Sequence, residues 1–326
     1  MPTPDERPDR NLALELVRVT ESAALAAARL VGMGDKEAAD QAAVDAMRVL
    51  LGSVHMDGVV VIGEGEKDEA PMLYNGEHIG DGSPPPVDIA VDPLEGTTLT
   101  AKGQPNALCV VALSERGTMF DPGPCVYMEK IAVGPDGKGV VSIEQTVTEN
   151  LRELAKAKHS SVRDLTAVIL DRDRHADIIA EVRSVGSRIR LIPDGDVAGS
   201  LMATSPNIGV DLLWGVGGTP EGVLSAAAIK STSGTLLGRM WPRDDDERAR
   251  TVAAGIDPDR ILDQDDLIEG GNCFFAATGV TDGDILKGVR FTSEEAFTTS
   301  IVMRSRSGTV RIVEGRHRRD RLRVRI

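Results

Sequence analysis

Aromatic residues are scarce in this chain: Phe, Tyr and Trp make up only 3% of its 326 residues. The core must therefore be built from aliphatic side chains, chiefly Val, Leu, Ile and Ala. No apolar run is long enough to span a bilayer, and the first residues lack the basic and apolar regions of a signal peptide. With 41% hydrophobic and 27% charged residues, the composition predicts a soluble globular protein of about two domains or one large one.

Cysteine is also sparse. Cys109, Cys125 and Cys273 are odd in number and widely spaced, and the chain contains no C-x-x-C pair. The five histidines are few and scattered. This pattern argues against a disulfide framework and against a zinc site, so we expect the protein to reside in the reducing cytoplasm.

Positive charge is in the minority. The net charge of −14 argues against non-specific binding to nucleic acid. The exception is the segment 316–326, which holds six Arg and one Asp. Such a tail could bind RNA or an acidic partner, but we favour a disordered, solubilising end or pairing with the protein's own acidic surface. Residues 1–10 are also expected to be disordered.

The most informative stretch is VDIAVDPLEGTT, residues 87–98. Its first half alternates apolar residues with Asp88, Ala90 and Asp92, which predicts a strand. Pro93 cannot extend the ladder, so a turn is expected there. That turn presents Glu95, a glycine and two hydroxyls, which are the groups a metal-bound phosphate needs. Alone, the stretch fits an ordinary strand end and a solvated acidic turn equally well.

Two carboxylates earlier in the chain also occupy positions that suit a metal or ligand. Asp40 lies in a helix predicted from a cap at Asp35 to about Leu51, on a side that is mostly apolar. There it needs a cation or a metal, unless it sits at the edge of the apolar stripe and meets water. Glu64 lies between two glycines just after the apolar strand 59–62, where the backbone can bend sharply toward a ligand. The simpler interpretation of that segment is a solvated acidic loop.

From Leu165 onward the pattern strand, loop, helix occurs three times, with strands at 165–170, 188–192 and 210–214. In open α/β sheets, ligands bind at the carboxyl ends of parallel strands. The loops at these ends carry arginines and acids in alternation, which favours an anionic ligand beside a cation site. Surface ion pairs, turns and helix-dipole charges are the simpler interpretations. The residues concerned are Arg172, Arg174, Asp194, Asp196 and Glu221.

Capping residues predict further boundaries. Thr148 is expected to cap a helix that runs to about Lys158, and Thr219 to cap a helix whose first residue is Pro220. A strand is expected near 139–143.

The candidate cluster of acids contains no nitrogen or sulfur ligand, which favours Mg²⁺ or Mn²⁺ over zinc or copper. Carboxylates at one site repel each other unless divalent cations neutralise them. Two such metals could activate a water for attack, and Thr97 could orient it. No P-loop, nucleophile elbow or H-E-x-x-H motif competes with this interpretation. The members of the cluster are Asp40, Glu64, Asp92, Glu95 and Glu221.

At this point a resemblance to a known family becomes visible. The segment DPLEGT, residues 92–97, resembles the D-P-x-[DE]-G-[TS] motif of the lithium-sensitive, metal-dependent sugar phosphatases. Four further motifs, in the family's order, make the chain similar to class II fructose-1,6-bisphosphatases from about Leu12 to Val313. These motifs are ADQAA at 39–43, GEGEKDEAPM at 63–72, DGDV at 194–197 and GGTPEG at 217–222.

The resemblance implies a role for each matching residue. The acids of the cluster would be the metal ligands, and Thr97, Glu64 and Asp68 would act in catalysis. Many members have Lys and Pro where Arg172 and Asp173 stand, and Asp173 adds a negative charge beside a phosphate contact. The sugar-phosphate contacts would be Glu95, Gly96, Thr97, Tyr127, Arg172, Asp173, Arg174, Asp194, Gly195, Asp196 and Gly218.

The resemblance also implies a layered α/β/α/β/α sugar-phosphatase fold with the active site between two sheet-containing halves. We expect these halves at 11–164, carrying the metal site, and 165–315, carrying the sugar-phosphate contacts. The implied function is hydrolysis of fructose 1,6-bisphosphate with Mg²⁺ or Mn²⁺ in gluconeogenesis, by a homo-oligomer (a dimer or tetramer). The alternatives are a sedoheptulose-1,7-bisphosphatase, an inositol-phosphate phosphatase, or a non-catalytic sugar-phosphate sensor whose Arg tail docks a partner.

Overall fold

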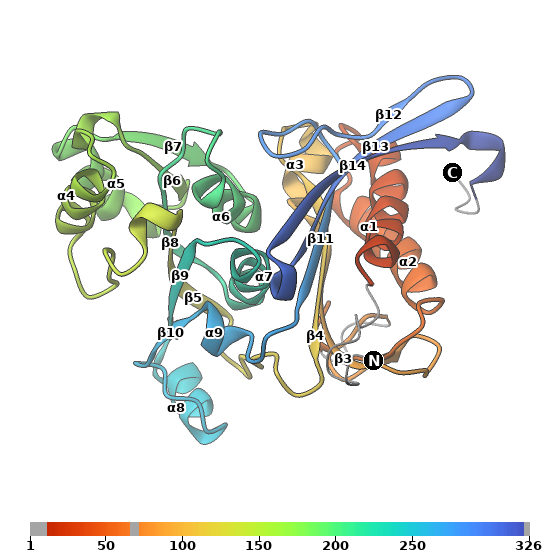
Figure 1. The fold of residues 1–326 in the computed structure, drawn as a ribbon, viewed down its shortest axis with the longest axis horizontal. Coiled ribbons are helices and arrows are strands. Elements are labelled where there is room, and N and C mark those ends of the chain that lie inside the picture. The colour runs from red at the N-terminus through yellow and green to blue at the C-terminus, as the bar shows by residue number, and fades with distance from the viewer. Residues whose placement is uncertain (1–11, 66–71, 323–326) are drawn as a thin grey trace, which may run out of the picture.

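The computed structural model describes residues 12–65 and 72–322. Predictions for 1–11, 66–71 (Asp68 among them) and 323–326 lie outside these ranges. Two sheets alternate with three layers of helices, so the expected α/β/α/β/α layering is confirmed (Figure 1). None of the helices in the described ranges is long and apolar enough to cross a membrane.

The helices cover the sheets in pairs (Figure 1). The first pair, α1 and α2, covers the outer face of the first sheet, and α6 and α7 lie between the sheets. The last pair, α4 and α5, covers the outer face of the second sheet. Their bounds are α1 Ala13–Ala27, α2 Lys36–Leu51, α4 Val147–Ala157, α5 Ala176–Ser184, α6 Asp196–Thr204 and α7 Thr219–Lys230; three others are α3 Thr97–Lys102, α8 Asp245–Ala253 and α9 Gln264–Leu267.

The first sheet has mixed strand directions. Its strands are β1 Asp57–Ile62, β2 His78–Ile79, β3 Pro86–Glu95, β4 Leu108–Glu115, β11 Phe274–Gly279, β12 Arg290–Phe291, β13 Glu295–Arg304 and β14 Thr309–Arg318. Their order is β12-β13-β11-β4-β3-β1-β2, and β14 pairs with β13. Strands β1 and β3 are parallel neighbours, so both run toward the same edge, where Glu64 and Glu95 lie.

The second sheet consists of β5 Tyr127–Val133, β6 Thr166–Leu170, β7 Arg188–Ile192, β8 Leu212–Gly218, β9 Thr235–Met240 and β10 Ile261–Asp263. The order is β10-β9-β5-β8-β6-β7. Strand β6 is parallel to both β7 and β8, so the three loops that follow these strands share one edge, as predicted.

The expected boundary at residues 164 and 165 does not separate the two sheets. The chain enters the second sheet already at β5 and returns to the first at β11. The sequence pattern could not reveal this, because strand periodicity says which face is buried but not which strand is the neighbour.

Three buried aliphatic clusters fill the spaces between the five layers. Strand β4 illustrates how one strand serves two of them. Val110 and Ala112 face the space between the sheets, whereas Val111 and Leu113 face α1 and α2. Burial of each such side chain contributes on the order of 1.5–3 kcal/mol, which compensates for the scarcity of aromatic residues.

Several local predictions require correction. Strand β3 continues past Pro93 to Glu95, because an irregularity in register between Asp92 and Glu95 accommodates the proline. Helix α4 is capped by Thr146 in a capping box with Glu149, two residues before the predicted cap. Helix α7 begins at Thr219, whose hydroxyl donates to the Cys125 carbonyl oxygen (2.9 Å) instead of capping.

The strand expected near 139–143 does not form either. Val141 and Ile143 are buried against α4 within the third cluster and pair with no strand in the described part of the chain. Short apolar runs of this kind bury their side chains equally well in a turn.

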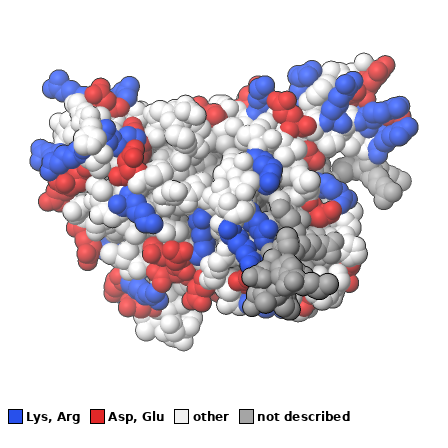
Figure 2. Space-filling view, in the orientation of Figure 1, with Lys and Arg blue, Asp and Glu red and all other residues white. Residues whose placement is uncertain are grey.

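The arginine-rich segment is partly ordered. Strand β14 continues through Arg316 to Arg318, and Arg316 Nε donates to Glu295 Oε1 at 2.6 Å. Figure 2 shows Lys and Arg gathered at the upper right, around β12 to β14, and Asp and Glu at the lower left, over α8. Up to Leu322, the segment therefore pairs with the protein's own acidic groups and is not a disordered end.

Candidate active site

One cavity of about 370 Å³ gathers the predicted acids from both halves of the molecule. It lies where β1 and β3 end, facing the first turns of α6 and α7. All five candidate metal ligands line it: Asp40 from α2, Glu64 after β1, Asp92 and Glu95 from β3, and Glu221 from α7.

Asp40 reaches the cavity because of how α2 begins and packs. The Asp35 side chain accepts a hydrogen bond from the Ala38 backbone N–H at 2.9 Å, as predicted for a cap. Ala39 and Ala43 are buried beside it in the cluster under α1. Asp40 itself is half-buried, and burial raises the pKa of its carboxyl. It is therefore not an edge residue in full contact with water.

Glu64 is held where the backbone at Gly63 passes very close to the backbone of Leu73. A Cβ at Gly63 would lie 1.8 Å from the carbonyl oxygen of Leu73, so only glycine fits there. The Glu64 N–H donates to the same oxygen at 2.9 Å, and the Gly63 N–H donates to Asn75 Oδ1 at 2.9 Å. Burial, and then the nearby charge of Asp40, raise the pKa of Glu64 to about 7.

Asp92 is the electrostatic centre of the cluster. Its pKa is raised well above the ordinary value, first by burial and then by the charges of Glu95, Glu221, Glu64 and Asp40. The five acids are thus close enough to repel one another, and without cations the cluster favours partial protonation.

Glu95 connects the two sheets. Its side chain is buried, with 4% of its surface exposed. Its carboxylate oxygens accept hydrogen bonds from the backbone N–H groups of Val197 (2.6 Å) and Ala198 (3.3 Å) in the first turn of α6. Burial and the charge of Asp196 raise its pKa well above the ordinary value, while the Val197 hydrogen bond works in the other direction.

Gly96 and Thr97 follow Glu95 along the cavity wall. Gly96 has φ +85°, a left-handed conformation that favours glycine, and it turns the chain into α3. Thr97, the first residue of α3, is half-buried and lines the cavity. The loop Asp194–Gly195–Asp196 supplies the opposite wall.

The remaining predicted contacts do not line this cavity. Arg174 donates from Nε (3.1 Å) and Nη2 (2.9 Å) to the carbonyl oxygen of Val216, and its guanidinium lies 5.1 Å from the Tyr127 ring centre. Arg172 Nη1 donates to the Pro193 carbonyl oxygen at 2.6 Å. The edge of the second sheet that carries the Asp194–Asp196 loop also carries these two arginines, Asp173, Tyr127 and Gly218.

Sequence reasoning missed one residue beside the cavity. Lys130 in β5 has 1% of its surface exposed, and its ammonium pairs with Asp196. The available signal was a lysine at the position between Met128 and Ala132 on the same face of an alternating strand. Such a residue needs a buried partner.

The donor set of the cavity fits divalent cations. Across the described ranges, no three His, Cys, Asp or Glu side chains converge closely enough to hold an ion as they stand. The cavity nevertheless gathers carboxylate oxygens, and a divalent cation would relieve their mutual repulsion. The residues that could hold such ions are Asp40, Glu64, Asp92, Glu95 and Glu221.

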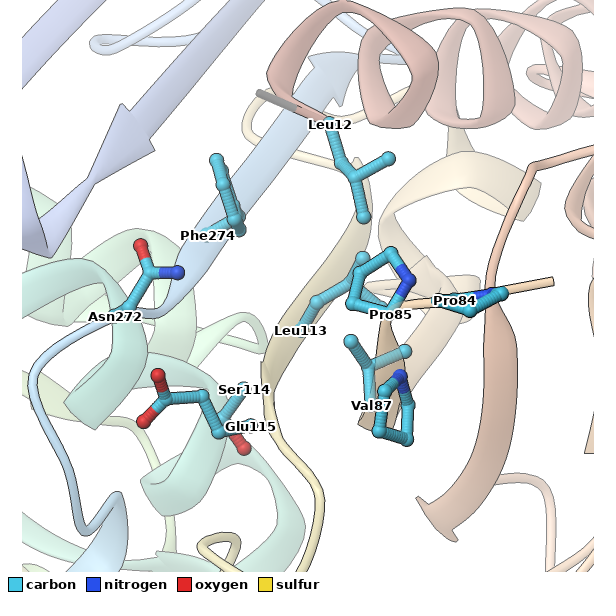
Figure 3. A pocket seen from close by; sticks show the side chains of 10 residues that line it. Leu12, Pro84, Pro85, Val87, Leu113, Ser114, Glu115, Asn272 and Phe274 are labelled. Carbon is cyan, nitrogen blue, oxygen red and sulfur yellow. The ribbon is translucent and has the colours of Figure 1, made fainter. Parts of the chain in front are cut away.

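A second cavity of about 370 Å³ lies at the opposite end of the first sheet (Figure 3). Its wall is mostly apolar and includes Leu12, Pro85, Leu113 and Phe274. Glu115 is the single ionisable residue among those that line it. It therefore lacks the ligands for a cation or a phosphate.

The five-layer fold and a carboxylate-lined cavity between its sheets define a metal-dependent phosphatase of the sugar-phosphatase type. Comparison with known proteins specifies the family. The family model described as "Bacterial fructose-1,6-bisphosphatase, glpX-encoded" matches residues 10–317. The chain is 45% identical to "Fructose-1,6-bisphosphatase 1 class 2" of Escherichia coli K12 over 325 residues, 96% of each protein.

The same identity and coverage relate it to "Fructose-1,6-bisphosphatase class 2" of Escherichia coli O6:H1 and of Shigella flexneri. The chain belongs to the glpX-encoded, class 2 fructose-1,6-bisphosphatase family.

Proposed function

We propose that this protein hydrolyses fructose 1,6-bisphosphate to fructose 6-phosphate and phosphate, by attack of water on the 1-phosphate, as a step of gluconeogenesis. The names of its relatives support the reaction. The structural observation that carries it is the meeting of five carboxylates, drawn from both halves of the molecule, in one cavity with Thr97.

The five acids would hold Mg²⁺ or Mn²⁺. When bound, divalent cations supply activation of water and neutralise charge that builds up on the phosphoryl oxygens. Four of the five acids stand on helices or a strand, Asp40 on α2, Asp92 and Glu95 on β3 and Glu221 on α7, while Glu64 follows β1. This arrangement fixes the ligands before the substrate arrives.

The chain's own groups would orient and deprotonate the attacking water. The Thr97 hydroxyl lines the cavity and can hold the water by a hydrogen bond. Glu64 lines the same cavity and would take a proton from this water. As the bond between phosphorus and the C1 oxygen breaks, that oxygen would take up a proton from solvent. The family's motif would add Asp68, which lies outside the described residues.

The second sheet would hold the sugar and its other phosphate. Asp194 and Asp196 offer acceptors for sugar hydroxyl groups, with Gly195 between them in the cavity wall. Gly218 would contact the substrate from the end of β8, opposite Tyr127. Arg172 and Arg174 provide cations, and the Tyr127 ring lies under the Arg174 guanidinium. Asp173, exposed between the two arginines, weakens the positive potential there.

We further propose a homo-oligomer in the cytoplasm, with no nucleic-acid or membrane partner. The three cysteines are buried and free, which suits a reducing compartment.

The deciding experiment is phosphate release from fructose 1,6-bisphosphate with Mg²⁺, Mn²⁺ or EDTA, beside sedoheptulose 1,7-bisphosphate and an inositol phosphate. We expect release that requires a divalent cation and a kcat/KM highest for fructose 1,6-bisphosphate. A higher kcat/KM for either rival would reassign the substrate. Tight binding of the bisphosphate without any release would indicate a sensor.

A further inference from the structure

Lys130 is a cation buried beside the active-site cavity. It lies in β5 on the face that also carries Met128 and Ala132, toward the space between the two sheets. Only 1% of its surface is exposed. An ammonium in such apolar surroundings is strongly destabilising unless it is paired and hydrogen-bonded. Its partners therefore explain why a lysine occupies this position.

The Lys130 ammonium bridges two elements of the site. It donates to the carboxylate of Asp196 and, at 2.7 Å, to the carbonyl oxygen of Gly218. Asp196 is the first residue of α6, and Gly218 immediately precedes α7. One buried group thus fixes the beginning of both helices that separate the sheets.

Two glycines leave room for this bridge. A Cβ at Gly217 would lie 1.9 Å from Asp196 Oδ2 and 3.1 Å from Lys130 Nζ. A Cβ at Gly218 would lie 1.8 Å from Glu221 Oε2. Glycine at these two positions therefore permits the close approach of the lysine and the two acids.

The bridge also lies beside a second acid. The Lys130 ammonium pairs with Asp196, and the Gly218 carbonyl oxygen that it holds comes three residues before Glu221, in the first turn of α7. No other Lys or Arg in the described ranges contacts Asp196 or Gly218.

We propose that Lys130 is a positioning residue, whose ammonium locks the sugar-binding Asp196 and Gly218 to each other and thereby fixes the cation ligand Glu221 at the start of α7. This inference rests on the proposed function, which gives Asp196, Gly218 and Glu221 their roles. Lys130 acts through these residues and does not itself line the cavity.

The test compares Lys130→Met with Lys230→Met. Lys230, at the other end of α7, also donates to one aspartate, Asp265, and to one carbonyl oxygen, that of Ile268 (2.6 Å). We expect Lys130→Met to lower kcat/KM by about 100-fold or more at a temperature where it stays folded, with part of the loss in KM, as expected when groups that bind substrate are displaced. Lys230→Met should stay within about twofold of the wild type, since surface pairs contribute little.

A charge-balanced variant separates geometry from charge and from folding. Lys130→Met/Asp196→Asn removes one charge of each sign, so it should fold even if Lys130→Met does not. We expect it to bind Mn²⁺ about tenfold more weakly than the wild type, measured by electron paramagnetic resonance, because this pair carries no net charge in either protein and only the position of Glu221 differs. Equal Mn²⁺ affinity in the double variant and the wild type would overturn the proposal.

The Mn²⁺ measurement needs no turnover. A wild type that releases no phosphate would therefore defeat the proposed function, while the affinity difference between the double variant and the wild type would still test the role of Lys130.

Discussion

Glu95 Oε1 lies 2.6 Å from the backbone nitrogen of Val197, and this contact joins the two sheets at the active site. Glu95 ends a strand of the first sheet, whereas Val197 lies in the first turn of α6. The carboxylate thus occupies the positive end of a helix and the acidic cavity at the same time. Changes to Glu95 should affect both the metal site and the contact between the sheets.

We predict that Glu95→Gln lowers phosphatase activity by about 100-fold or more, because the site loses a charged ligand. It should also accelerate amide hydrogen exchange at Val197 and Ala198, since a charged acceptor is replaced by a weaker neutral one. Hydrogen exchange of the metal-free protein, read on a peptide covering 195–200, is the measurement. Asp35→Asn, which keeps a capping acceptor on α2, is the control and should leave that peptide unchanged. Unaltered exchange in Glu95→Gln would contradict the helix contact.

The acid cluster predicts an unusual dependence of stability on pH in the metal-free protein. Glu64 and Glu221 have pKa values raised from 4.5 to about 7. A raised carboxyl pKa means that the folded state binds protons more tightly than the unfolded state. The resulting stability is present below about pH 4.5 and is lost as pH rises through about 7. The Tm in EDTA should therefore fall from pH 5 to pH 8, and added Mg²⁺ should reverse much of the fall.

Variants isolate this effect from other titrations. Burial lowers the pKa of His175, which makes the folded protein more stable at higher pH. This contribution is the same in all the proteins compared. Glu64→Gln should flatten the decline in Tm between pH 5 and pH 8. If the variant and the wild type gave parallel curves in EDTA, the raised pKa of Glu64 would not be the cause.

Two substitutions test the catalytic roles directly. Asp92→Asn and Thr97→Ala should each lower kcat by about 100-fold or more, because the first removes a central ligand and the second the hydroxyl that orients water. Phosphate release is the assay, and circular dichroism checks the fold. Thr97→Ser keeps the hydroxyl and should retain most of the activity. Full activity in a folded Thr97→Ala protein would remove Thr97 from the mechanism.

Gly63→Ala tests the close backbone contact between Gly63 and Leu73 that holds Glu64. The added methyl would meet the Leu73 carbonyl oxygen at 1.8 Å, so we expect a loss of about 1–3 kcal/mol in the free energy of unfolding. Urea denaturation measures it. Gly52→Ala is the matched control, because its nearest neighbour would be 3.5 Å away and its φ is −61°. An unchanged free energy of unfolding in both variants would show that the contact between Gly63 and Leu73 tolerates a side chain.

The sequence was most informative where the chain places polar residues at strand ends. Glu64 and Asp194 each follow a strand and Asp92 lies near the end of one, and all three line one cavity. The five layers followed from the family resemblance, not from periodicity. The loops after β6, β7 and β8 were assigned to one edge correctly because parallel strands end on the same side.

Other features depend on contacts that no local pattern encodes. Lys130 looked unremarkable because its partners, Asp196 and Gly218, are 66 and 88 residues away. Strand β14 reaches Arg318, inside the arginine-rich segment, because its ladder with β13 overrides the low strand preference of a charged segment. The division between the sheets was misplaced for the same reason.

The route of the chain has a consequence during synthesis. Strand β4 forms an antiparallel pair with β11, with Cys109 opposite Thr278, and the whole second sheet lies between them in the sequence. A nascent chain that has emerged only as far as β10 must therefore expose the unpaired edge of β4, which is a site for association with other chains. The second sheet can form on the ribosome, whereas the first is completed only after the last strands have been translated.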